Sequence, residues 1–364
     1  MKKLILKTLL FLSPFILFIG LDLFILPEDF FHYRQLETLY VIKMSDKLPG
    51  PYYPNRIITR SVEGALGYRT PFAVKETVTW ITDRYGYRTK DRDLNHYDIV
   101  IVGESDIYAE KTDQENLLSV VLENELHASV YPLAPSSDEL KNKFLSLKRF
   151  HDNPPKLVIL ARNERYITSL KDFLNLRPPQ NNQYIDLPLI NNNLLLQYYL
   201  LLDRFHKSNM LNYIKSRSRE LTGTRPMYPH VNDELFFDGK SILERIETVD
   251  INYVHDIALT LKKYKESLNS LGIEFIFLPI PIKENILFAK LGIPTQPQFL
   301  RKLITELNSM GVTTIDTQKI FEESTKQSSA VFHKDDNHWN ATGIKVVSRD
   351  LIEKIRKGKM LSRF

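Results

Sequence analysis

Short apolar runs alternate with helical segments along most of this chain. The runs are DIVIV at 98–102, SVYPL at 129–133, KLVILA at 156–161, EFIFLPI at 274–280 and TTIDT at 313–317. Continuous apolar runs are typical of strands buried on both faces, and helices between such strands cover a parallel sheet. The pattern therefore predicts an α/β fold of three layers, in which a central parallel sheet lies between helices.

Local patterns place the ends of several helices. Thr112-x-x-Glu115 and Ser136-x-x-Glu139 have the spacing of a capping box, in which two side chains satisfy the free N–H groups at a helix start. A further helix is expected over 252–270, where a glycine follows and a strand begins. These helices fall between the predicted strands and favour the same fold.

Two stretches depart from this alternation. Residues 168–250 contain a Pro-Pro pair, two Asn-rich segments and the apolar run LLLQYYLLLDRF, and we interpret them as a mostly helical insertion that shapes a substrate cleft or a partner surface. Residues 28–75 are rich in Pro, Tyr and Arg and have little periodicity, which is typical of a juxtamembrane connection. The main folded domain is then expected at 76–360, with the insertion at 168–250 inside it.

The N-terminus reads as a membrane segment. Three lysines, Lys2, Lys3 and Lys7, flank a mostly apolar stretch of about 19 residues, the length of a helix that crosses the hydrocarbon core. No small-residue cleavage site follows, so residues 1–27 are predicted to be an uncleaved signal anchor, a transmembrane helix. Because flanking lysines stay in the cytoplasm, the rest of the chain is expected to be extracytoplasmic, periplasmic or extracellular.

Charge and composition narrow the class of protein. The net charge of +5 is concentrated at the two ends, in residues 1–7 and 351–364, so the body is close to neutral. Without a basic stripe in the body, nucleic acid is not an expected partner. The chain has no cysteine, which excludes disulfides and thiol catalysis. The sequence implies no metal site and no cofactor.

Three polar segments carry candidate chemistry. Ser105 follows the strand at 98–102, Asn163 follows the strand at 156–161, and His338 precedes the last helix. Ligands collect at the carboxyl ends of parallel strands, so the three segments are expected to converge. Ser105 would be the nucleophile, His338 its base, and an aspartate the group that orients the histidine ring.

The orienting aspartate has two candidates. Asp336 stands at the D-x-H spacing and Asp335 at the D-x-x-H spacing, and Asp336 is favoured. An oxyanion also needs fixed N–H donors, which the backbone amide of Ser105 and the side chain of Asn163 would supply.

These motifs resemble the SGNH (GDSL-type) hydrolases, and more narrowly the membrane-anchored relatives of the alginate O-acetyltransferases. The block-one serine lies in GES at 103–105, the third block is similar to ARNE at 161–164, and the final block is DNHWN at 336–340. Two further segments are similar to the acetyltransferase-like branch: TDRYGYR at 82–88 and LPIPIKENI at 278–286. The resemblance covers roughly residues 50–355 and implies an SGNH-hydrolase-like fold with serine catalysis.

The chain departs from the family pattern in three respects. Glu104 stands where the usual residue is aspartate, and the second block, which normally supplies a glycine N–H to the oxyanion hole, falls in 133–136 with no glycine. The acetyltransferases themselves place the Asp-His block before the serine, whereas here it comes last, as in ordinary SGNH hydrolases.

Four more residues have two interpretations each. Lys283 is a candidate substrate contact or a solvated charge at a strand end, and Arg165 and Arg88 are candidate carboxylate clamps or members of structural ion pairs. Trp339 would stack on a sugar ring or pack so as to position His338.

The resemblance implies O-acetyl transfer onto a cell-surface polysaccharide, with a membrane-embedded protein as a candidate acyl donor. A carbohydrate esterase that removes O-acetyl groups is the first alternative. A non-catalytic glycan-binding or assembly protein on the same fold is the second, since the second-block glycine is missing.

Overall fold

The computed structural model describes residues 2–26, 39–40, 50–68, 70–92, 96–177 and 228–361, together with single positions between 194 and 222. The described chain divides into two compact units. The first contains 1–53 and 188–227, and the second contains 54–187 and 228–364. Half of the apolar run at 194–205 lies outside the described residues, and the positions described within it are helical, as predicted.

A parallel sheet of four strands forms the centre of the second unit. The strands are β3 (Ile99–Val102), β4 (Val130–Leu133), β5 (Leu157–Asn163) and β8 (Glu274–Ile280), in the order β4-β3-β5-β8. All neighbouring pairs are parallel, with Ile99 opposite both Val130 and Leu157. The predicted α/β fold with a central parallel sheet is confirmed.

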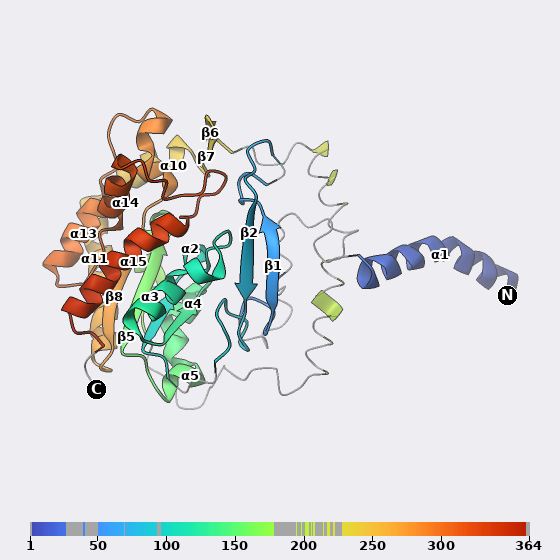
Figure 1. Ribbon diagram of the computed structural model, residues 1–364, viewed down its shortest axis with the longest axis horizontal. Helices are drawn as coiled ribbons and strands as arrows, with labels where there is room; N and C mark the ends of the chain where they lie inside the picture. Colours follow the sequence, from blue (N-terminus) through green and yellow to red (C-terminus); the bar gives the residue numbers. More distant parts are fainter. Residues whose placement is uncertain are drawn as a thin grey trace. The chain divides into compact units, whose positions relative to one another are not determined.

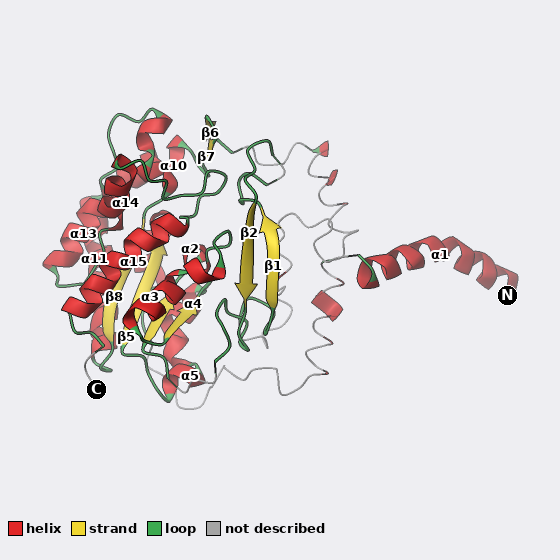
Figure 2. Cartoon of the chain, viewed as in Figure 1, coloured by secondary structure: helices red, strands yellow, loops and turns green. Residues whose placement is uncertain are grey.

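Helices cover both faces of the sheet, as Figures 1 and 2 show. Alternate strand residues belong to two separate cores. Val100, Val158 and Phe275 pack with α11 and α13, whereas Ile101, Ile159 and Ile276 pack with α3, α14 and α15. The two cores explain why the strands are apolar at every position, and they make the three predicted layers.

The helices of the second unit are α2 (Ser105–Tyr108), α3 (Leu118–Leu126), α4 (Asp138–Lys143), α5 (Lys148–His151), α6 (Glu164–Ile167), α7 (Leu170–Phe173), α10 (Lys240–Glu247), α11 (Ile251–Asn269), α12 (Lys283–Ile286), α13 (Phe299–Ser309), α14 (Thr317–Lys326) and α15 (Ala341–Lys357). Short 3₁₀ turns lie at Gln114–Asn116, Phe144–Ser146 and Phe288–Leu291. The helix expected over 252–270 corresponds to α11, which Asp250 caps by accepting a bond from the N–H of Asn252.

Three local predictions are wrong. The run at 313–317 forms only a single bridge, Phe277 to Thr314, rather than a fifth strand. Thr112 caps no helix. The element that follows is the 3₁₀ turn Gln114–Asn116, and its N-cap residue is Asp113. The second cap lies one residue late, at Ser137, whose side chain accepts the N–H of Leu140 at 3.1 Å.

The segment 54–75 belongs to the same unit as the sheet and does not behave as a simple connection. It contains β1 (Ile57–Val62), which pairs antiparallel with β2 (Glu76–Ile81). A second small antiparallel pair, β6 (His230–Val231) with β7 (Glu234–Leu235), lies in the described part of the insertion.

The first unit carries one long apolar helix, α1 (Lys2–Phe24). Its residues 2–22 are long and apolar enough to cross a membrane, and its side chains are almost all exposed. A membrane anchor and a signal sequence both have this character.

Candidate active site

The structure pairs His338 with Asp336. The Nδ1 atom of the imidazole lies 2.6 Å from Oδ1 of Asp336, and the same oxygen accepts the backbone N–H of His338 at 3.1 Å. The two-residue spacing allows one carboxylate to hold both groups, as in an Asx turn. Nδ1 is therefore occupied, and Nε2 is the nitrogen left to act on a substrate or a nucleophile.

Asp335 points elsewhere. Its carboxylate is fully buried and accepts the N–H groups of Gly64 and Val74, both at 2.8 Å, and it pairs with the ammonium of Lys111 at 2.5 Å. Of the two candidate aspartates, only Asp336 is in contact with the histidine ring.

The electrostatics of the pair favour a charged histidine. Burial of His338 favours the neutral ring, but the Asp336 carboxylate outweighs it, with help from Asp106 and Glu110, and raises the pKa of His338 to about 9. Burial alone would raise the pKa of Asp336. The charge of His338 and the hydrogen bonds from His338 and from the N–H of Ala65 outweigh burial, so the pKa of Asp336 is lowered. The free site therefore holds an imidazolium beside a carboxylate at neutral pH.

A glycine-containing segment that sequence analysis missed encloses this pair. The N–H of Ala65 donates to Oδ2 of Asp336 at 2.7 Å, and those of Leu66 and Gly67 donate to the carbonyl of Asp335. A Cβ on Gly64 would lie 2.2 Å from that carbonyl oxygen, so only glycine fits there. The Gly-x-x-Gly spacing at 64–67 is the one signal in the sequence that could have pointed to it.

Lys283, the first residue of α12, supports the same loop. Its side chain is completely buried, and its ammonium donates to the carbonyls of His333, Lys334 and Asp336 at 2.6, 2.9 and 3.3 Å. Glu234 pairs with it at 2.8 Å. The structure thus contradicts the solvated strand-end charge, and no group of Lys283 is left open to a substrate.

Ser105 begins α2, directly after β3 and Gly103. A Cβ on Gly103 would lie 2.4 Å from the side chain of Ile107, so the glycine lets α2 turn tightly back onto the strand. Ser105 is half-buried. Within the described residues, no hydrogen bond joins its hydroxyl to His338, as is common where a substrate is needed to tighten catalytic contacts.

Trp339 connects the histidine loop to the serine helix. Its indole N–H donates to the backbone carbonyl of Asp106, the residue after Ser105, at 2.6 Å. The ring is fully buried, with Phe321 at 6.2 Å between centroids. Of its two interpretations, the structure therefore favours packing that positions His338 over stacking on a sugar.

Asn163 ends β5 and lies at the same edge of the sheet. Its Oδ1 accepts the N–H of Arg165 at 3.1 Å, and its amide nitrogen donates to Oδ2 of Asp106 at 3.0 Å. Oδ2 of Asp106 thus engages one of the two amide hydrogens of Asn163.

The second block contributes no free donor at Ser136. Both the N–H and the hydroxyl of Ser136 donate to the carbonyl of Gly103, each at 2.8 Å. Ser136 therefore supports the end of the serine strand, and the Asn163 side chain and the Ser105 amide stay the predicted oxyanion donors.

The two arginines have structural partners. Arg165 pairs with Asp238 and packs over the ring of Phe237 at 4.3 Å. Arg88 is buried and donates to carbonyls on both sides of the loop after α2, including those of Tyr108 and Thr112 at 2.6 Å each. In the described ranges, no group of three or more His, Asp and Glu side chains is arranged to hold a metal ion.

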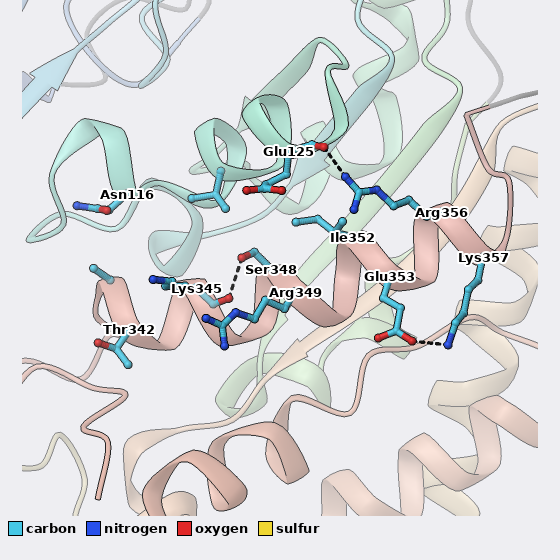
Figure 3. A pocket seen from close by; sticks show the side chains of 12 residues that line it. Asn116, Glu125, Thr342, Lys345, Ser348, Arg349, Ile352, Glu353, Arg356 and Lys357 are labelled. Carbon is cyan, nitrogen blue, oxygen red and sulfur yellow. Dashed lines mark hydrogen bonds and ion pairs between the residues drawn. The ribbon is translucent and has the colours of Figure 1, made fainter. Parts of the chain in front are cut away.

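Neither of two surface pockets on this unit is lined by Ser105 or His338. The larger, of about 710 Å³, lies between α3 and α15 (Figure 3) and is lined by Glu125, Lys345 and Arg349 among others. The smaller, of about 280 Å³, is lined by Lys111, by His333 and by the start of α15. The chemistry at Ser105 therefore lies outside both pockets.

A parallel sheet with a serine after β3, an asparagine at the end of β5 and an Asp-x-His motif before the last helix has the block order of an SGNH-type hydrolase. Residues 236–363 match the family model of the SGNH hydrolase-like domain of the acetyltransferase AlgX. The chain therefore carries an SGNH hydrolase-like region, and the match covers the final block but not Ser105 or Asn163.

Other comparisons add little. No curated protein matches the chain. Among solved structures, it is similar to an α/β hydrolase enzyme from the metagenome of Lake Arreo, Spain, at 11% identity and a TM-score of 0.35, over 73% of this chain and 96% of that one. A likeness at that score carries no argument about function.

Proposed function

We propose that this protein is a serine-dependent O-acetyltransferase that acts outside the cytoplasm on a cell-surface polysaccharide. The observation that carries the proposal is the 2.6 Å contact of His338 with Asp336 in a loop that Trp339 ties to the serine helix. The match of residues 236–363 to the SGNH hydrolase-like domain of an acetyltransferase supports the transfer of an acetyl group.

The reaction would proceed in two steps. The hydroxyl of Ser105 attacks the acetyl carbonyl while its proton passes to Nε2 of His338, and Asp336 stabilises the imidazolium that forms. The oxyanion is held by the Ser105 N–H and the Asn163 amide. His338 then returns its proton to the departing group, which leaves acetyl-Ser105. A sugar hydroxyl attacks this ester while His338 takes its proton. His338 then gives that proton to Oγ of Ser105 as the ester bond breaks, which releases the acetylated sugar and free Ser105.

The esterase alternative shares the first step. In a carbohydrate esterase, water replaces the sugar hydroxyl in the second step, and the two enzymes differ only in what resolves acetyl-Ser105. The non-catalytic alternative has its own support, since the N–H and hydroxyl of Ser136 are both engaged and no bond joins Ser105 to His338 among the described residues.

Covalent labelling tests whether the site is catalytic. A fluorophosphonate should label the purified full chain at Ser105, and Ser105→Ala should abolish the label. Ser137→Ala, which removes only the cap of α4, serves as the matched control and should label as the wild type does. A wild-type chain that takes up no label at pH 9, where His338 is half-deprotonated, would favour the glycan-binding alternative.

Acceptor dependence separates transfer from hydrolysis. With an activated acetyl ester, a transferase should show a burst of one acetyl group per chain and then slow turnover. Added oligosaccharide should speed turnover and become acetylated. Steady release of free acetate at a rate that acceptor does not change would identify an esterase.

A further inference from the structure

Glu104 joins the two strand ends that carry the site. It lies directly before Ser105, at the start of α2, and its side chain does not cap that helix. Its Oε1 instead pairs with Arg162, which lies directly before Asn163 at the end of β5. The residues that follow the two members of this ion pair are therefore the predicted nucleophile and a predicted oxyanion donor.

Strand pairing does not reach the two oxyanion donors. Pairing of β3 with β5 ends at Val102, and ladder hydrogen bonds hold neighbouring strands in register only where the strands are paired. Beyond that point, side chains link the two segments in the described part of the chain. Glu104 pairs with Arg162. Asn163 donates to Oδ2 of Asp106 at 3.0 Å. The separation of the donors therefore depends on these side-chain contacts.

Arg162 is itself held in one orientation. Its side chain is buried, its Nε donates to the carbonyl of Tyr166 at 3.1 Å, and its Nη2 donates to the hydroxyl of Ser169 at 2.9 Å. Nη1 is the group that pairs with Glu104. A planar guanidinium bound through all three nitrogens cannot turn without breaking a hydrogen bond. The carboxylate of Glu104 is thus fixed relative to β5.

Lys141 brings a second buried cation to the same carboxylate oxygen. Its ammonium lies 3.1 Å from Oε1 of Glu104 and 2.9 Å from Oδ1 of Asp138, and it donates to the carbonyl of Ser136 at 3.1 Å. The other oxygen of Glu104, Oε2, is buried without a hydrogen-bond partner among the described residues. Loss of the Glu104 charge would leave two buried cations with less compensation, which is costly inside a protein.

We propose that Glu104 is a positioning residue of this site, whose ion pair with Arg162 sets the distance between the Ser105 N–H and the Asn163 side chain. The inference rests on the proposed function, in which these two groups stabilise the oxyanion. Such donors act only at hydrogen-bond distance from the place where the oxyanion forms. A change in their separation therefore weakens binding of the transition state more than binding of the substrate.

The test measures how fast a fluorophosphonate reacts with Ser105 in the full-length protein. Its phosphoryl oxygen takes the place of the oxyanion, so the maximal rate constant of labelling, kinact, reports on the two donors. Glu104→Gln should lower kinact by about 10- to 100-fold, the effect of a misplacement of about 1 Å. The half-saturating concentration of the probe, KI, should stay within about two-fold, because the donors act mainly in the transition state.

Combination with Asn163→Ala separates positioning from a purely structural role. Where the side-chain donor is absent, its distance from Ser105 no longer matters, so Glu104→Gln should lower kinact by less than about two-fold in that background. A clamp that only stabilises the fold would cause the same loss in both backgrounds, and that result would overturn the proposal. An unchanged kinact in Glu104→Gln alone would overturn it as well.

Two more variants complete the design. Glu139→Gln is the matched control, because it makes the same chemical change on α4, where the exposed Glu139 pairs with Lys143 at 2.5 Å, and it should label at the wild-type rate. If circular dichroism shows that Glu104→Gln does not fold, Glu104→Asp replaces it, since aspartate keeps the negative charge but is one methylene shorter. Its kinact should fall several-fold, and only where Asn163 is present. A wild-type rate in Glu104→Asp would overturn the proposal.

The labelling results distinguish the two proposals. A wild-type chain that takes up no label refutes the proposed function, and the positioning role with it. A wild-type chain that labels at Ser105 while Glu104→Gln labels equally fast refutes the positioning role alone.

Discussion

Two adjacent buried aspartates have separate partners in this protein. Asp336 holds the imidazole of His338, and Asp335 holds Lys111 and two backbone N–H groups of the 64–74 segment. Both carboxylates hold the same loop through these contacts. Only that of Asp336 contacts the histidine ring.

Exchange of each aspartate for asparagine should separate these roles. Asp336→Asn should lower kcat by about 10⁴-fold, because an amide no longer fixes the ring tautomer or stabilises the imidazolium. Asp335→Asn should leave kcat within a few-fold and lower the free energy of unfolding by about 2 kcal/mol, because Lys111 loses a buried charged partner. Initial rates with an activated acetyl ester and urea unfolding measure the two effects. Normal rates in Asp336→Asn would remove that residue from the mechanism.

At the scale of elements, the segment 64–67 acts as a cradle for the histidine loop. It presents consecutive N–H groups to the carboxylates and to the carbonyl of Asp335, and Lys283 secures the same loop by its carbonyls. The histidine loop is thus positioned by backbone groups from a segment more than 260 residues away in sequence.

Gly64→Ala should disturb this cradle. The added Cβ would lie 2.2 Å from the Asp335 carbonyl oxygen, so the cradle or the loop must move, and both kcat and stability should fall. Gly311→Ala is the control: its φ of +72° makes alanine cost about 1 kcal/mol, but nothing lies within 4 Å of the new Cβ. Equal losses of kcat in the two variants would mean that the cradle does not position the site.

At the scale of the whole molecule, α1 has the length and composition of the predicted membrane anchor. Its apolar length suits a bilayer, and its lysines precede the apolar stretch. A protein anchored in this way would present the SGNH-like unit to a polysaccharide outside the cytoplasm.

Reporter fusions test the orientation. Alkaline phosphatase joined to the C-terminus of the full chain should be active, because it folds only outside the cytoplasm, and a fluorescent protein that folds only inside should stay dark. The reverse pattern would place the SGNH-like unit in the cytoplasm and contradict the surface-polysaccharide acceptor. Replacing Lys2, Lys3 and Lys7 with glutamine should weaken the orientation preference without changing the fold of the second unit.

The sequence by itself determined the sheet and the candidate chemistry. Four of the five predicted strands are present because continuous burial on both faces leaves an apolar run that is visible locally. Ser105, Asn163 and His338 stand out for another reason: each follows a strand or precedes a helix in a short recognisable pattern. The match of 236–363 to the SGNH hydrolase-like domain covers the final block with His338.

Only the tertiary structure decided which side chains meet. Spacing favoured Asp336 but kept Asp335 as an alternative, and Lys283 was expected as a substrate contact or a solvated charge. Neither periodicity nor composition reports contacts between distant segments. The cradle at 64–67 and the contact of Trp339 with Asp106 depend on hydrogen bonds across more than 260 and 230 residues respectively. Such contacts are fixed by how the layers pack. The sequence therefore predicts the candidate residues Ser105, Asn163 and His338, whereas only the tertiary structure shows which residues hold them in place.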